Sequence, residues 1–167
     1  MNCVTNLEFE YGCATLFNLE ELKCPSNYRR YVLATPVSLI VTTDTGILKV
    51  HTDKGFIFDG RSGPSIIDWY APNLGSLEER AAWFVHDCLG YGGSLSFKDT
   101  NLILKYILRD RCGYRKSKAE VIRLAVSLSK SWYGKPEPGD PWYRNQFKVS
   151  TEWVPFASGA IPSPVQP

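Results

Sequence analysis

The fold of this chain is decided by the stretch from Ser76 to Gly134, which reads SLEERAAWFVHDCLGYGGSLSFKDTNLILKYILRDRCGYRKSKAEVIRLAVSLSKSWYG. The pattern Ser-x-x-Asp/Glu occurs in it three times, each time before an apolar run. In this pattern the serine accepts a hydrogen bond from a free N–H of the first helical turn, and the acid bonds back to the serine N–H and suits the helix dipole. Each run then reaches a glycine, which readily adopts the left-handed conformation that ends many helices. The stretch therefore predicts three helices, which start at Ser76, Ser96 and Ser117 and end at Gly90, Gly113 and Gly134.

The middle helix is the most apolar of the three. Ile103 and Ile107 form one stripe along it, and Leu104 and Leu108 lie beside that stripe. A helix that is apolar over much of its girth is usually buried on several sides. We therefore expect it to lie between the other two.

The residues before this stretch favour β-structure. Strand-forming residues are concentrated in Tyr31–Leu33 and Val37–Val41. Thr43–Gly46 is typical of a turn, and it is followed by a returning strand, Ile47–His51, and a further short one, Phe56–Phe58. A small N-terminal antiparallel sheet followed by a three-helix bundle is an α+β fold.

The composition changes after Gly134. Seven of the 11 prolines lie from Pro136 onward, together with aromatic residues such as Trp142 and Trp153. Proline discourages a continued helix, and large aromatic side chains tend to be buried. We therefore expect a single domain over residues 1–134 and an extended proline- and aromatic-rich arm over residues 135–167. The arm either wraps its own domain or docks on another chain.

Charge, hydropathy and cysteine usage exclude several classes of protein. The 19 basic residues nearly balance the 17 acidic ones, so no nucleic-acid partner is predicted. No apolar run approaches the ~20 residues that span a bilayer, and the first residues do not resemble a secretory signal. The five cysteines are odd in number and contain no CxxC pair, which favours free thiols in a reducing compartment.

Four residues could form a hydrolytic site. His86 could take a proton from water, and Asp99, at the start of the next helix, could orient its ring. Asp87 and Asp59, with carbonyl oxygens of the glycine-rich loop after Phe58, could hold a hard cation such as calcium. The cation would polarise an ester carbonyl. The sequence thus predicts His86 and Asp99 as catalytic residues and Asp87 and Asp59 as metal ligands.

Each of these residues also has a structural interpretation. Asp99 is the acid of a helix cap, Asp59 precedes a glycine and suits a turn, and His86 flanks an apolar stripe like many core histidines. The only other histidine, His51, lies on an expected strand and should reach the surface. A metal site built from several histidines is therefore disfavoured. Cys88 lies two residues from His86, and such helix neighbours point apart.

From about Ser38 to Trp132 the chain resembles the phage and prophage family known as domain of unknown function 1353. That family shows T-D-G-A-S-x-P, a tryptophan segment, A-A-x-x-H-D-x-L-Y and then an aspartate that opens a helix. The matching residues here are Asp59, Gly60, Ser62, Pro64, Trp69, Ala81, Ala82, His86, Asp87, Leu89 and Asp99. The chain departs from the pattern at Phe58, Arg61, Gly63 and Gly90.

A fainter resemblance is to the motif order of secreted and parvoviral phospholipases. It implies that His86 activates water, Asp87 binds calcium and Asp99 orients the histidine.

These resemblances imply two functions. The first is a virion or tail-associated structural protein that docks to other phage structural proteins through its C-terminal arm, with a homo-oligomer as a further option. The alternative is a calcium-assisted His/Asp hydrolase, either phospholipase-like or another envelope esterase. The expected location is the virion, or the host cytoplasm during assembly.

Overall fold

The computed structural model describes residues 1–17, 20–21, 31–58, 75–128 and 143–157. The elements within them are β1 (Val4–Tyr11), α1 (Cys13–Phe17), β2 (Glu20–Glu21), β3 (Tyr31–Val32), β4 (Val37–Thr43), β5 (Gly46–Thr52), β6 (Ile57–Phe58), α3 (Leu77–Gly92), α4 (Phe97–Asp110), α5 (Lys116–Leu128), the 3-10 helix η2 (Tyr143–Phe147) and β7 (Val149–Pro155). Among these residues no helix has both the length and the apolar character that crossing a membrane requires.

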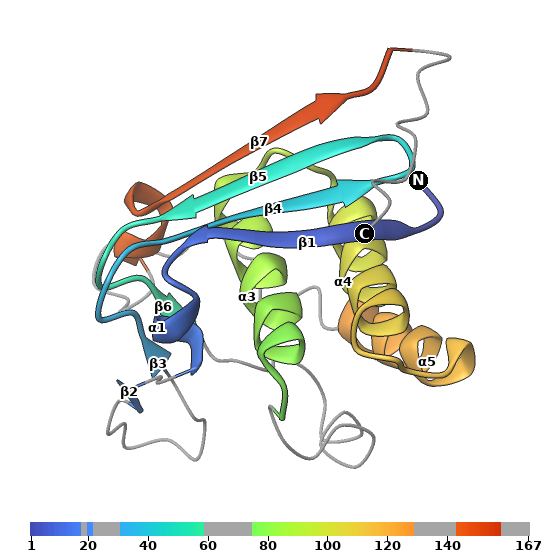
Figure 1. Cartoon of the computed structure of the whole chain (residues 1–167), viewed down its shortest axis with the longest axis horizontal. Helices are drawn as coiled ribbons and strands as arrows, with labels where there is room; N and C mark the ends of the chain where they lie inside the picture. The colour runs from blue at the N-terminus through green and yellow to red at the C-terminus, as the bar shows by residue number, and fades with distance from the viewer. Residues whose placement is uncertain (18–19, 22–30, 59–74, 129–142, 158–167) are drawn as a thin grey trace.

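The centre of the molecule is an antiparallel sheet with the strand order β1-β4-β5-β7 (Figure 1). Three of these strands come from the N-terminal part, and the helices follow them in sequence, so the predicted α+β class is confirmed. A smaller sheet, in the order β2-β3-β6, lies below one end of the large one. Its Phe58 packs edge-on against Phe84 of α3, with ring centroids 5.7 Å apart.

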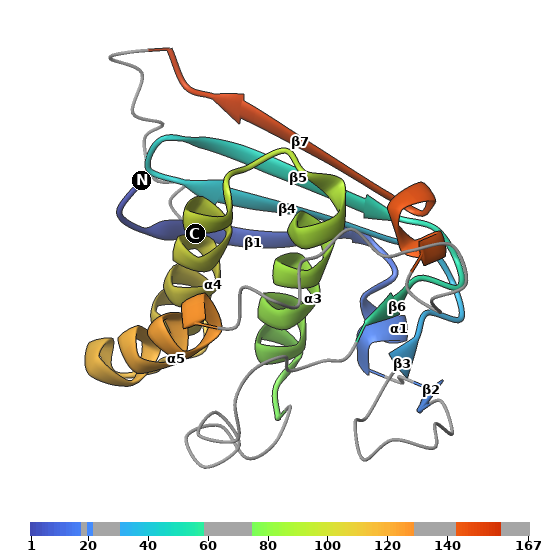
Figure 2. The same ribbon diagram turned by 180° about the vertical axis from the view of Figure 1, so that it is seen from behind.

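The helices cover one face of the large sheet, as the view from behind also shows (Figure 2). Side chains of a strand alternate between its two faces, so every second residue points to the helices. On β4 and β5 these residues are Leu39, Val41, Leu48 and Val50, all fully buried. The residues between them, such as Lys49, form the outer face.

The first predicted helix is α3, and its start is confirmed. Ser76 accepts from the N–H of Glu79, and the Glu79 carboxylate accepts from the Ser76 N–H, which completes the capping box. The predicted end at Gly90 was wrong, because the helix continues through Gly92 and ends at Gly93, whose φ is 66°. A glycine inside a helix is tolerated at a modest cost, so Gly90 alone did not fix the boundary.

The other two helices agree in part with the prediction. Ser96 caps α4, and this helix packs between α3 and α5 as expected. Helix α5 begins at Lys116, so Ser117 lies within its first turn and is not the cap. The predicted end at Gly134 lies outside the described residues.

Both ends of the chain contribute edge strands. The strand β1 was not predicted, although Leu7, Phe9 and Tyr11 alternate with polar residues as a half-buried strand does. In the C-terminal arm, β7 pairs with β5 from Val149 to Pro155, so this part of the arm wraps its own domain. η2 precedes β7, and its Asn145 carboxamide accepts from the N–H of Ile57 at 3.0 Å.

Candidate functional site

The predicted site residue His86 lies in the core of the helical layer. Helix α3 carries it on the face that packs on α4, and its side chain is completely buried. Its ring meets the indole of Trp83 edge-on, with centroids 6.3 Å apart. The sequence placed His86 beside an apolar stripe, and burial of that stripe takes the imidazole into the interior.

A chain of side-chain hydrogen bonds leads from His86 across the three helices. The His86 Nε2 lies 2.9 Å from the Oδ1 of Asn101 on α4, and the Asn101 Nδ2 donates to the Ser127 Oγ on α5 at 3.1 Å. The Ser127 hydroxyl donates in turn to the carbonyl of Arg123 at 2.8 Å. Because the Asn101 amide and the Ser127 hydroxyl are already used as donors, Nε2 of His86 carries the proton that Oδ1 accepts. Polar groups of three helices thus satisfy one another in the interior.

The expected partner Asp99 has a different role in the described contacts. Its carboxylate accepts a hydrogen bond from the Ser96 hydroxyl at 2.6 Å, and its backbone N–H donates to the Ser96 Oγ at 3.2 Å. The hydrogen bond at Nε2 of His86 is made by Asn101, two residues further along α4. Sequence reasoning missed Asn101. The signal that could have found it is a polar residue inside the most apolar helix, where an unpaired carboxamide would be costly.

Of the two expected metal ligands, one is described. Asp87 follows His86, is almost completely buried, and places its Oδ1 3.6 Å from the Nδ1 of His86. Asp59 lies outside the described residues. In the part of the chain that the structure covers, no group of three or more His, Cys, Asp or Glu side chains is placed to hold a metal ion.

The next residue in sequence, Cys88, carries an unreactive thiol. Cys88 is fully buried, and burial, together with the nearby Asp87 charge, raises its pKa well above the usual range. A protonated thiol is a poor nucleophile, so Cys88 does not form a reactive pair with His86. The described cysteines, Cys3, Cys13, Cys88 and Cys112, are free; Cys24 lies outside the described residues.

The outer face of the sheet carries the second histidine. His51 lies on β5 with 41% of its side chain exposed, in agreement with the surface position expected. The Tyr11 hydroxyl lies 2.6 Å from its Nδ1, and the Asp53 carboxylate lies 3.6 Å from its Nε2. Ser38 of β4 lies between Tyr11 and His51 in the strand register, and its small side chain lets the tyrosine reach across it. Tyr11 and His51 thus lie on the outer face of the sheet, partly exposed to solvent.

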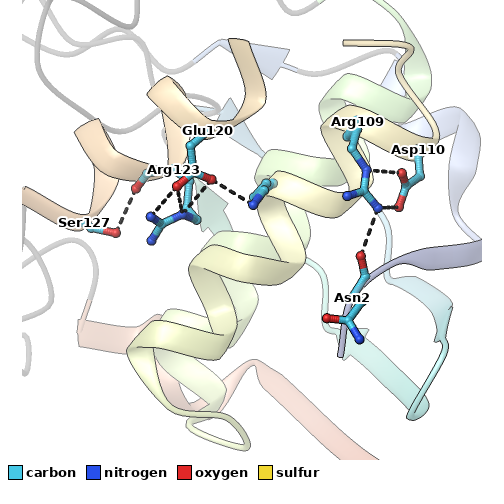
Figure 3. A network of polar contacts seen from close by, with 7 residues as sticks. Asn2, Arg109, Asp110, Glu120, Arg123 and Ser127 are labelled. Atoms are coloured by element: carbon cyan, nitrogen blue, oxygen red, sulfur yellow. Dashed lines mark hydrogen bonds and ion pairs between the residues drawn. The ribbon is translucent and has the colours of Figure 1, made fainter. Parts of the chain in front are cut away.

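Charged pairs fix the helices to one another and to the sheet (Figure 3). Glu120 of α5 bonds Arg123 on its own helix at 2.6 Å and Lys105 on α4 at 2.8 Å. These two cations lower the pKa of Glu120 to about 2. At the C-terminal end of α4, Arg109 pairs with Asp110 and also donates to the carbonyl of Asn2, which precedes β1.

Comparison with known proteins identified no relative. No protein-family model, no curated protein and no solved structure matches this chain.

Proposed function

We propose that this chain is a phage-encoded structural protein of the virion or tail, which acts by docking to neighbouring subunits and not by catalysis. The observation that carries the proposal is the position of His86, the residue best suited by type to catalysis. A general base must reach the proton that it abstracts. A fully buried imidazole whose Nε2 is engaged by Asn101 is suited instead to holding helices together.

The resemblance of the His86–Asp87 motif and its flanking residues to a phage family supports the setting. The C-terminal arm supports the docking role, because its strand β7 forms an outer edge of the sheet. Under this proposal the partners are other phage structural proteins, and the chain is located in the virion, or in the host cytoplasm during assembly.

Mass spectrometry of purified particles tests the proposal. A structural protein should be present at a fixed copy number relative to other virion proteins and should resist washing with salt. A phage that carries His86→Gln provides the matched variant, because the glutamine amide can donate the same hydrogen bond to Asn101. We expect this phage to assemble and infect normally. Absence of the chain from particles, or normal assembly with lost infectivity in the variant, would contradict the proposal.

A calcium-assisted hydrolase is the second candidate. The observation that favours it is the pair His86 and Asp87, whose Nδ1 and Oδ1 lie 3.6 Å apart, with Asn101 fixing the ring from its other nitrogen. The test incubates the purified chain with phospholipid vesicles or soluble esters. A hydrolase requires turnover that chelation of calcium abolishes and that His86→Gln removes while the fold remains intact. Without turnover on any of these substrates this candidate fails.

A further inference from the structure

The two edges of the large sheet are built differently. At the β1 edge, the pairing with β4 shifts register twice, between Val4 and Asn6 and between Phe9 and Tyr11. The end of α4 also covers this edge, since the Asp110 carboxylate accepts from the Val4 N–H at 2.9 Å. Bulges and covering groups are the usual means by which an edge strand is kept from pairing with another chain.

Within the described part of the chain, the β7 edge has neither protection. All seven of its residues pair with β5 in one continuous register. Next to this ladder, the Phe156 N–H donates to Thr45 at 2.9 Å and the Asp53 N–H donates to Lys148 at 2.8 Å. Hydrogen bonding alternates along an antiparallel strand, so the even-numbered residues of β7 face β5.

The odd-numbered residues Val149, Thr151 and Trp153 therefore direct their N–H and C=O groups away from the sheet. Pro155, which has no N–H, ends this row. No strand within the described residues pairs with it, and Figure 1 shows β7 as the outermost strand. As far as the described residues extend, this edge therefore presents three N–H donors and three C=O acceptors to another strand.

We propose that β7 pairs antiparallel with β7 of a second copy of this chain, so that two sheets join into one across a two-fold axis at Thr151. The inference goes beyond the proposed function and does not depend on the phage setting. It commits to a second copy because the sequence of β7 is complementary to itself when two copies run antiparallel.

In that register Thr151 lies opposite Thr151, and Val149 opposite Trp153. These outward-facing residues exchange N–H···O=C bonds in both directions, and Val149 and Trp153 form a favourable cross-strand pair of aromatic and β-branched side chains. On the outer face, Ser150 of one copy lies opposite Glu152 of the second copy, and Lys148 of the first copy lies diagonally across from that same carboxylate.

Registers shifted toward the C-terminal end of β7 are less favourable. Moving the axis to Glu152 places two glutamates directly opposite each other, which is destabilising. Moving it to Trp153 places Pro155 opposite Thr151 and removes a donor. Within each copy Lys49 lies 3.1 Å from the Glu152 carboxylate and neutralises it.

Light scattering after gel filtration of the full chain, at increasing concentration in reducing buffer, tests the pairing. The mass should rise from 18.8 kDa toward twice that value, with dissociation in the micromolar range that suits a small interface. Ser150→Glu places like charges opposite each other twice in the dimer and should weaken association by about tenfold. Ser150→Lys, the matched control, faces Glu152 and should retain or strengthen association. Both changes lie at an exposed position, so the fold is preserved.

Two further measurements locate the interface. Thr151→Pro removes an N–H that points away from β5 and should leave a folded monomer. Amide exchange of the wild type should slow with concentration at Val149, Thr151 and Trp153, and stay unchanged at Ser150 and Glu152. A mass of one chain at every concentration would overturn the proposal. So would assembly that Ser150→Glu and Ser150→Lys affect equally, or exchange that is insensitive to concentration at all five amides.

Discussion

Asn101 shows how one side chain holds three elements at the scale of the residue. It lies on the central helix α4 and is almost completely buried. Its Oδ1 accepts a hydrogen bond from His86 on α3, and its Nδ2 donates one to Ser127 on α5. A buried polar group that loses its partner costs more than the hydrogen bond contributed, because the group left behind stays desolvated. The bridge therefore specifies how the helices pack.

Replacing Asn101 by alanine should be strongly destabilising. The change leaves the His86 Nε2–H and the Ser127 hydroxyl without their present partner, and we expect a loss of about 1–3 kcal/mol in the free energy of unfolding. Urea denaturation measures it. The matched control is Asn6→Ala on the exposed side of β1, which should stay within about 0.5 kcal/mol of the wild type. Equal effects of the two changes would show that the bridge contributes nothing.

The thiols give a second prediction at this scale. Cys13 is exposed, whereas Cys88 is fully buried and burial raises its pKa well above the usual range. Cys112 is half-buried, and burial with the nearby glutamates raises its pKa to about 12. A thiolate is the reactive form, so alkylation of the native protein should modify Cys13 first and Cys88 only after unfolding. Peptide mapping by mass spectrometry gives the order, and early modification of Cys88 would contradict its burial.

At the scale of elements, Glu120 ties α5 to α4. Its carboxylate bonds Arg123 and, across the helices, Lys105, and these bonds hold its pKa near 2 instead of 4.5 (Figure 3). A carboxylate whose pKa is lower in the folded state stabilises the protein above its unfolded pKa. That contribution disappears as the pH falls through the folded pKa. The relevant window therefore lies between about pH 4.5 and about pH 2.

Glu120→Gln should accordingly destabilise the protein at neutral pH and have no effect near pH 2. The carboxylate is about one-third exposed, so solvent screening keeps the loss below about 1 kcal/mol. Urea denaturation of both proteins at several pH values gives the difference in unfolding free energy. Glu152→Gln, in an exposed pair with Lys49, is the control and should change little at any pH. A difference between Glu120→Gln and the wild type that does not vary with pH would count against the ion pair.

The end of α3 packs directly on β7. A Cβ added to Gly92 would lie 2.5 Å from the Thr151 Oγ1 and 2.7 Å from its Cγ2. Gly92→Ala should therefore lower the free energy of unfolding by about 1–3 kcal/mol through overpacking, although alanine is the better helix former. Thr151→Ala removes both clashing atoms and should restore stability in the double variant, which a double-mutant cycle measures. Additive effects of the two changes would rule out the contact.

At the scale of the whole molecule, the two edge strands of the sheet come from opposite ends of the chain. β1 forms one edge and β7 the other, with β4 and β5 between them. The core side chains of β5, such as Leu48 and Val50, are fully buried, and β5 pairs with β4 on one side and β7 on the other. The C-terminal arm is therefore a structural part of the α+β domain over residues 143–155.

Ending the chain at residue 142 should destabilise the whole domain. This truncation removes β7 and the Asn145 contact with Ile57, and it turns β5 into an edge. We expect the melting temperature, followed by circular dichroism, to fall by more than about 5 °C. Removal of residues 158–167 alone keeps β7 and serves as the control truncation. A truncated chain that melts like the wild type would show that the arm is dispensable for folding.

The sequence by itself determined the positions of helices α3 and α4 and of the central strands β4 and β5. Their signals are local: a cap joins residues three apart, and periodicity is read along one segment. The partner of His86, the placement of β7 beside β5 and the contrast between the two sheet edges were decided only by the tertiary structure. Each depends on residues far apart in the chain, and no local pattern states which of them will meet. Burial of the apolar stripe on α3 took His86 inward, and there its Nε2 bonds Asn101 of α4.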